Sequence, residues 1–134
     1  MNYGRELRLL VVHDQKDFCD FFREQVDLNR HLYKIDCQCT TSGRQALELI
    51  REWAPTVVLL DAHISDINSF QVLDGCKSRE VSVILTSESV SSEIEKSAQK
   101  HGACGYCQSF DDPDLIEQLL HQIVTMVQCP SQIH

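Results

Sequence analysis

An aspartate follows directly behind a run of four aliphatic residues near the middle of the chain. The run is Val57-Val58-Leu59-Leu60, and the aspartate is Asp61. A short apolar run bounded by polar residues is typical of a strand buried on both faces, and its first polar successor lies at the carboxyl edge of a sheet. Ligands bind at that edge in open α/β sheets. Asp61 is therefore the first candidate site residue, although an ordinary acid at a strand end is the plainer alternative.

Two histidines and a second aspartate could join Asp61 at this edge. His13 and Asp14 follow another apolar run, and His63 stands two residues beyond Asp61. Together these four side chains offer nitrogen and oxygen ligands, a mixture that suits zinc, nickel or copper better than Mg²⁺. A transition-metal site is one hypothesis. The alternative is that the histidines only line a polar pocket and that Asp14 caps the following helix.

The chain also contains seven cysteines, at positions 19, 37, 39, 76, 104, 107 and 129. An odd number without a secretory signal indicates reduced thiols, most of them acting as small buried hydrophobic residues. Cys104-Gly105-Tyr106-Cys107 has the Cys-x-x-Cys spacing of dithiol redox sites, and Cys37 and Cys39 form a closer pair. A thiol redox sensor is therefore a further minor alternative. The 104–107 segment is expected to run through a strand, where the two thiols face opposite sides.

Short β-rich runs alternate with longer amphipathic ones along the chain. We expect strands at 7–12, 33–39, 57–60, 81–86 and 103–107. We expect helices at 16–28, 42–53, 70–77, 93–101 and from 113 to about 127. Gly102 should end the fourth helix in the left-handed conformation, and Asp112 should cap the last helix, with Pro113 as its first residue.

This alternation predicts an α/β fold with a single doubly wound, five-stranded parallel sheet. Right-handed crossovers bring the carboxyl ends of all parallel strands to one edge. The polar residues expected there are His13, Asp14, Asp61, His63, Thr86 and Ser109. The edge of the sheet is therefore the predicted site.

The 134 residues are expected to form one domain, 1–128, with 129–134 as a tail or the start of a linker. The net charge of −8 disfavours binding of nucleic acid or of anionic membranes, which need a basic face. No run is long enough to span a membrane, and the first residues do not resemble a signal peptide. We therefore expect a cytoplasmic protein.

The order of these motifs resembles the receiver domain of two-component response regulators, with its flavodoxin-like (βα)5 fold. That family has an acidic pair after strand one, a phosphorylated aspartate after strand three, threonine or serine after strand four, and Lys-Pro after strand five. The corresponding residues here are His13-Asp14, Asp61, Thr86-Ser87 and Ser109-Phe110. Pro55 and the stretch Gly102-Ala103-Cys104-Gly105-Tyr106 also match, so the resemblance covers about 7–127.

The resemblance implies a role for each matching residue. Asp61 would be the phosphoacceptor, and Asp14, Asp61 and the backbone carbonyl of His63 would bind Mg²⁺. Thr86 and Tyr106 would form a conformational switch, although each also fits as an ordinary strand residue. The chain would be a signalling domain and not an enzyme. Its partners would be a histidine kinase or phosphotransfer protein and a protein partner or output domain.

Several residues depart from the family pattern. His13 replaces the first acid, which weakens the expected Mg²⁺ site, and Ser109 stands at the position of the missing lysine. Ser65, Ser69 and Phe110 stand where proline, glycine and cis-proline are usual. Two hypotheses follow: an atypical receiver that is still phosphorylated at Asp61, or a pseudo-receiver that docks partners without phosphorylation.

Overall fold

The computed structural model describes residues 7–77, 79–89, 91–108 and 112–128, and the side chains among them up to residue 125. Strands and helices alternate along the chain. The strands are β1 (Leu7–Val12), β2 (Ile35–Thr40), β3 (Val57–Asp61), β4 (Ser82–Ser87) and β5 (Gly105–Gln108). The helices are α1 (Lys16–Leu28), α2 (Gly43–Glu52), α3 (Ser69–Gly75), α4 (Ser92–Lys100) and α5 (Pro113–Gln128).

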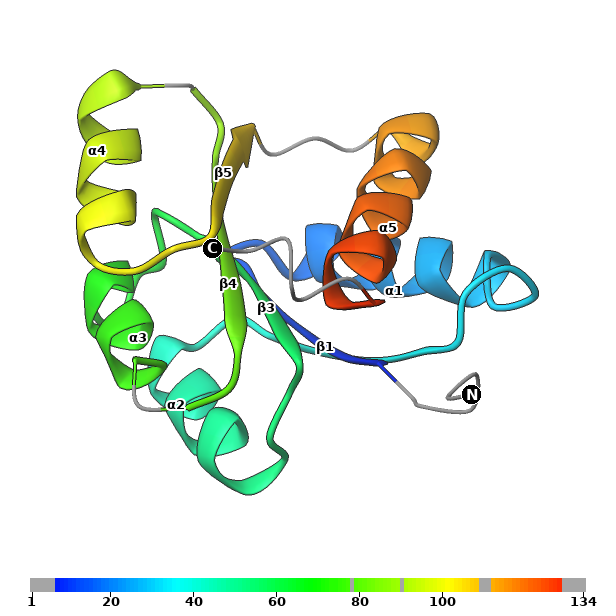
Figure 1. Ribbon diagram of the computed structural model, residues 1–134, viewed down its shortest axis with the longest axis horizontal. Coiled ribbons are helices and arrows are strands. Elements are labelled where there is room, and N and C mark those ends of the chain that lie inside the picture. The colour runs from blue at the N-terminus through cyan, green and yellow to red at the C-terminus, as the bar shows by residue number, and fades with distance from the viewer. Residues whose placement is uncertain (1–6, 78, 90, 109–111, 129–134) are drawn as a thin grey trace.

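All the strands form one parallel sheet in the order β2-β1-β3-β4-β5 (Figure 1). Helices α1 and α5 cover one face, and α2, α3 and α4 cover the other (Figure 1). The chain starts at β1, adds β2 at one edge and then β3, β4 and β5 toward the other edge, as in a doubly wound sheet. The predicted fold class is therefore confirmed.

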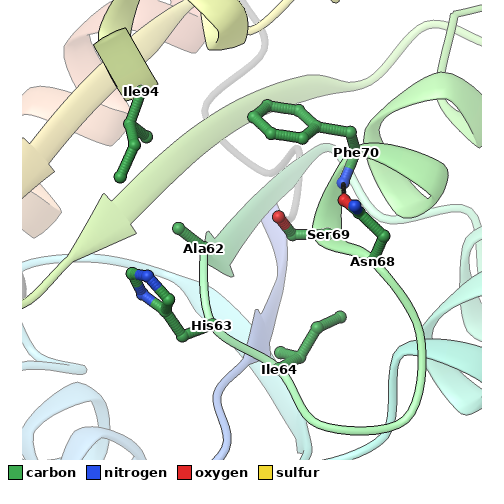
Figure 2. A pocket seen from close by; sticks show the side chains of 7 residues that line it. All are labelled: Ala62, His63, Ile64, Asn68, Ser69, Phe70 and Ile94. Atoms are coloured by element: carbon green, nitrogen blue, oxygen red, sulfur yellow. Dashed lines mark hydrogen bonds between the residues drawn. The ribbon is translucent and has the colours of Figure 1, made fainter. Parts of the chain in front are cut away.

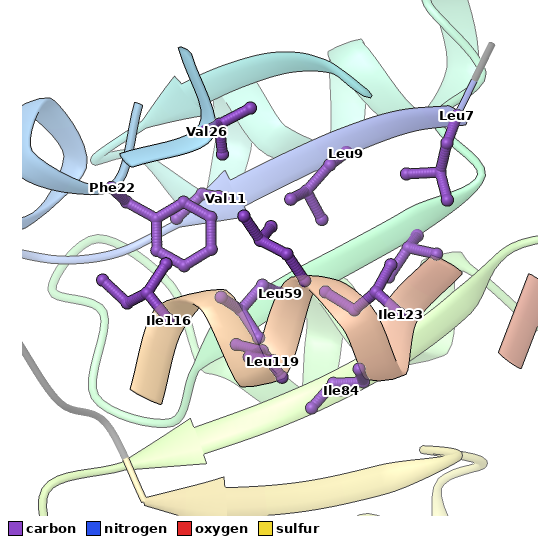
Figure 3. Close-up of a cluster of buried hydrophobic side chains, with 12 residues drawn as sticks. Leu7, Leu9, Val11, Phe22, Val26, Leu59, Ile84, Ile116, Leu119 and Ile123 are labelled. Atoms are coloured by element: carbon purple, nitrogen blue, oxygen red, sulfur yellow. The ribbon is translucent and has the colours of Figure 1, made fainter. Parts of the chain in front are cut away.

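Alternation along the central strands divides their side chains between two cores. Leu9, Val11, Leu59 and Ile84 face α1 and α5, where they pack against Phe22, Ile116 and Ile123 (Figure 3). Leu10, Val12, Val58, Leu60, Val83 and Leu85 face the other helices. Because β3 is buried on both faces, its continuous apolar run is explained, and Asp61 is the residue that ends it.

The element ends were predicted to within about two residues. Gly102 ends α4 with φ +97°, and the carboxylate of Asp112 accepts a hydrogen bond from the N–H of Asp114 at 2.9 Å. The strand expected from Tyr33 begins later, at Ile35. The N–H of Tyr33 still donates to the carbonyl of Asn29, which ties this residue to the end of α1.

Among the helices of the described ranges, none combines the length and the apolar composition that a membrane span requires. The expected tail at 129–134 lies outside the described residues. The domain boundary at residue 128 therefore stays a prediction.

Candidate functional site

The strand register places Asp61 between His13 and Thr86. Asp61 pairs with Thr86 of β4 across the parallel ladder, and the N–H of Ala62 donates to the carbonyl of Thr86 at 2.7 Å. On the other side, Val12 of β1 pairs with Leu60, so His13 and Asp61 leave their strands at the same level. The three side chains have only 6%, 5% and 4% of their surface exposed, in the order His13, Asp61, Thr86. These three residues therefore form a row of buried polar side chains at the predicted edge of the sheet.

Asp61 lies in an environment that disfavours its charge. Burial raises the pKa of its carboxyl, and the nearby carboxylate of Asp14 raises this pKa further. The charges of His13 and His63 and the backbone N–H of His63 lower this pKa and so partly offset the effect of burial. Burial removes water from this carboxylate, and its neighbours compensate the lost hydration of its charge only in part. Such a carboxylate is stabilised by a nearby cation or by binding a proton.

His13 is held by contacts on two sides of its ring. Its Nδ1 accepts a hydrogen bond from the N–H of Gln15 at 3.0 Å. Its ring stacks on Phe18, with 4.0 Å between ring centroids and 18° between ring planes. Burial lowers the pKa of His13, although Asp61, Asp14 and Glu88 partly offset this effect. His13 is thus a fixed aromatic side chain whose surroundings favour its neutral form.

The carboxylate of Asp14 contacts the loop that follows Asp61. The hydroxyl of Ser65 donates to Asp14 Oδ1 at 2.5 Å and so joins the β1–α1 loop to the β3–α3 loop. The alternative role of Asp14 as a helix cap is wrong, because the N-cap residue of α1 is Gln15 and its side chain makes no capping bond. Asp14 and Asp61 interact electrostatically, which places two acidic groups at one site.

These carboxylates fit Mg²⁺ in their chemistry, since Mg²⁺ prefers hard oxygen ligands and keeps several waters. Asp14 and Asp61 supply two such groups, and the raised pKa of Asp61 indicates that a cation there would be favourable. Within the described residues, no three or more His, Cys, Asp or Glu side chains are grouped as a metal site. This result weighs against the transition-metal hypothesis for His13, Asp14, Asp61 and His63.

Asp66 is a site-loop residue that the sequence reasoning missed. Its carboxylate accepts hydrogen bonds at the start of α2, from the N–H groups of Gly43 at 2.8 Å and Arg44 at 3.2 Å and from the hydroxyl of Ser42 at 2.8 Å. These bonds lower the pKa of Asp66 well below its usual range. The loop after Asp61 is thereby fixed to α2. No sequence spacing indicated this contact, because Asp66 and Gly43 belong to different β–α units.

A glycine at position 43 is needed for the same contact. A Cβ there would lie 2.6 Å from Ile64 Cδ1 and 2.7 Å from Ile67 Cγ1. Both isoleucines belong to the loop after Asp61, and both pack against the core on the α2 side. The loop can therefore approach α2 closely enough for Asp66 to cap it.

A pocket of about 370 Å³ opens beside the segment that follows Asp61 (Figure 2). The sequence reasoning did not identify it, because its walls come from separate elements. Ala62, His63 and Ile64 line it from the loop, and Ile94 from α4 lies across from Phe70 at the start of α3 (Figure 2). Asn68 and Ser69 complete it, and Asn68 Oδ1 accepts from the N–H of Phe70 at 2.8 Å.

The two residues of the expected switch point to different faces of the sheet. Thr86 follows Leu85, which pairs with Tyr106, so Thr86 and Tyr106 occupy alternate positions of the ladder. The half-buried Tyr106 packs against the core on the α4 side. Its hydroxyl accepts from the N–H of Ser91 at 3.2 Å and donates to the carbonyl of Ser89 at 3.3 Å. Tyr106 is therefore joined to the β4–α4 loop, which follows the strand that carries Thr86.

Ser109 and Phe110 lie outside the described residues, so their expected positions are not tested. The thiols are better defined. Burial raises the pKa of both Cys104 and Cys107, whereas reactive cysteines have lowered values. Cys76 is buried, with a pKa of about 11, and Cys19 is buried as well. The raised pKa values weigh against the redox alternative. The buried Cys19 and Cys76 agree with small hydrophobic roles, whereas Cys104 is exposed.

Sequence comparison finds response regulators. No protein-family model matches the chain. Over 84 residues, or 61% of this chain, it is 31% identical to the nitrate/nitrite response regulator protein NarL of Escherichia coli K12. NarL of E. coli O6:H1 matches equally well. The chain spans only 39% of the length of these curated relatives.

Structure comparison extends the likeness to nearly the whole chain. The signal receiver domain of a Luxo repressor protein from Vibrio parahaemolyticus has a TM-score of 0.82 at 18% identity, covering 97% of this chain and 98% of the other. A CheY-like response regulator receiver domain protein from Methanospirillum hungatei has a TM-score of 0.81 at 18% identity, covering 97% and 100%. The resemblance to response-regulator receiver domains is therefore confirmed, in fold over nearly the whole chain and in sequence over 84 residues.

Proposed function

We propose that this chain is a signalling receiver domain in which Asp61 accepts a phosphoryl group. The observation that carries the proposal is the position of Asp61 at the end of β3, in register with Thr86 and beside His13. The electrostatics support it, because a buried carboxylate with a raised pKa is more typical of a functional group than of a surface acid. The sequence match to a response regulator supports the signalling role.

The proposed chemistry is nucleophilic substitution at phosphorus. A carboxylate oxygen of Asp61 forms the new bond to phosphorus, and the donor's leaving group departs with the electron pair of the bond that breaks. With acetyl phosphate the leaving group is acetate, and the product is an acyl phosphate. Such a reaction needs mainly positioning and neutralisation of the oxygen charges.

Asp14 and Asp61 would hold Mg²⁺, together with the backbone carbonyl of His63. The ion would neutralise charge on the transferring phosphoryl oxygens when bound. We propose that this binding is weakened, because His13 contributes no negative charge and Ser65 already donates to Asp14. Ser109 would occupy the position of the missing lysine and add no cation.

Thr86 and Tyr106 would report the state of Asp61. The buried hydroxyl group of Thr86 stands next to Asp61 in the ladder, and Tyr106 fixes Ser89 and Ser91 of the adjoining loop. A phosphoryl group at Asp61 could favour one arrangement of this loop over another. The phosphodonor would be a histidine kinase or phosphotransfer protein, and the reader would be a protein partner or output domain in the cytoplasm.

The second candidate function is a pseudo-receiver that docks partners without phosphorylation. The contact that favours it is the hydrogen bond from Ser65 to Asp14, which engages an acid expected to bind metal. In that case the same edge of the sheet would stay in one state. The two candidates differ in whether Asp61 reacts.

The deciding experiment is intact-mass measurement after incubation with acetyl phosphate and Mg²⁺. We expect one phosphoryl adduct on the wild-type chain and none on Asp61→Asn. Asp20→Asn is the matched control, since Asp20 is an exposed acid of α1 that pairs with Lys16, and it should still be labelled. An unlabelled but folded wild-type chain would support the pseudo-receiver instead.

A further inference from the structure

His13 stands next to Asp61 at the edge of the sheet, and the contacts of its ring identify which nitrogen carries a hydrogen-bond donor. Nδ1 accepts from the N–H of Gln15 at 3.0 Å, so a neutral ring must carry its proton on Nε2. If the ring becomes protonated, Nε2 still carries a proton. The Nε2–H donor is therefore present in either charge state.

The ring also has little freedom to turn away from the site. It stacks on Phe18 at 4.0 Å, and its backbone N–H donates to the carbonyl of Thr40 at 3.1 Å. Rotating the ring by half a turn would put the Cδ2–H group in place of Nδ1 and so break the bond from Gln15. The orientation is thus fixed by packing on α1 and by one hydrogen bond.

The position of this donor is set by the sheet. His13 follows Val12, which pairs with Leu60, so His13 and Asp61 stand side by side at the ends of neighbouring strands. Neighbouring strands lie about 4.8 Å apart. The charges of Asp61, Asp14 and Glu88 all act on the ring, which shows that it lies among acidic groups. A donor on this ring is therefore a close neighbour of any group bound at Asp61.

We propose that His13 is a phosphoryl-contact residue whose Nε2–H donates to an oxygen of the group on Asp61, so that transfer retains a measurable rate without a divalent metal. This inference rests on the proposed function of Asp61. It also explains chemically why a histidine at position 13 could replace an acid. The histidine offers a fixed neutral donor where an acid would help to hold a metal ion. Removing one preorganised donor from a site of developing charge typically lowers a rate by about 10²–10³.

The test compares two isosteric replacements. Glutamine places an amide N–H near the position of Nε2, whereas asparagine places one near Nδ1. With acetyl phosphate and excess EDTA, we expect labelling of the wild-type chain, a loss of about 10²–10³ in its rate for His13→Asn, and recovery of most of that loss for His13→Gln. Asp61→Asn is the blank, and circular dichroism checks the fold of each variant.

Two further measurements do not depend on turnover. Nitrogen-15 NMR of the wild-type ring should show a protonated Nε2 and an unprotonated Nδ1, as the bond from Gln15 requires. His13→Asp should tighten Mg²⁺ binding measured by calorimetry, because it adds a carboxylate beside Asp14. A purely structural role of His13 does not predict the difference between the two amide variants.

The outcomes separate this inference from the proposed function. A wild-type chain that is labelled with Mg²⁺ but not in EDTA overturns the role of His13 alone. Equal rates for wild type and His13→Asn, or a proton found on Nδ1, do the same. A wild-type chain that is unlabelled under both conditions overturns the function of Asp61 and this inference with it.

Discussion

The hydroxyl of Ser87 offers the sharpest test of the packing at the end of β4. Ser87 has 0% of its surface exposed, and within the described residues its Oγ is the only buried side-chain nitrogen or oxygen without a hydrogen-bond partner. A buried polar group without a partner costs about 1–3 kcal/mol. We therefore expect Ser87→Ala to stabilise the protein.

The expected gain in stability follows from that cost, and the expected shift in unfolding temperature follows from the length of the chain. Alanine and serine differ little in volume, and neither is a preferred strand residue, so most of the 1–3 kcal/mol should appear as added stability, roughly 1–2 kcal/mol. Unfolding entropy of about 2.1 cal/mol/K per residue gives roughly 280 cal/mol/K for 134 residues. The midpoint of thermal unfolding should then rise by about 3–7 °C.

The assay is urea unfolding of both proteins, followed by fluorescence of Trp53. We expect a higher midpoint with an unchanged slope, because the surface exposed on unfolding stays the same. Ser82→Ala is the matched control: Ser82 begins the same strand but is only half-buried, so its removal should not stabilise. A less stable Ser87→Ala would refute the reasoning and show that this hydroxyl has a partner, such as an ordered water.

Three further predictions concern the loops around the site. Asp66→Asn should lower stability at pH 7, and the difference from wild type should shrink as the pH falls below about 4 in urea titrations, since the pKa of Asp66 is lowered in the folded state. Asp61→Asn should instead raise stability at pH 7, with a gap that closes on acidification, because the folded-state pKa of Asp61 is raised. Tyr106→Phe removes the bonds to Ser89 and Ser91, so the N–H of Ser91 should exchange faster in NMR, at a cost of about 0.5–1.5 kcal/mol.

The fold could be predicted because local patterns and long-range topology agree. The run 57–60 is apolar throughout because β3 is central and covered on both faces. Gly102 and Asp112 marked helix ends by mechanisms that act within a few residues. The strand expected from Tyr33 began late because Asn29, at the end of α1, still holds that residue. Features fixed by neighbours in sequence were thus the predictable ones.

The candidate site was predictable only in part. Strand ends brought His13, Asp61 and Thr86 together, as parallel topology requires. The bonds of Asp14 to Ser65 and of Asp66 to α2 were not predictable, because each joins loops that topology alone does not place in register. Such contacts depend on the path of a loop, and loop paths follow from packing details such as the missing Cβ at position 43.

Asp61 and Asp66 show how the structure separates a functional acid from a structural one. Asp61 is the last residue of β3, and Asp66 lies in the loop between β3 and α3. Asp66 is satisfied by three donors at the start of α2, so its charge stabilises the fold. Asp61 is buried, its charge is disfavoured, and the fold would be more stable with a neutral group there. A protein keeps a destabilising charge where the charge has a task, so the opposite pKa shifts of the two acids favour Asp61, and not Asp66, as the reactive residue.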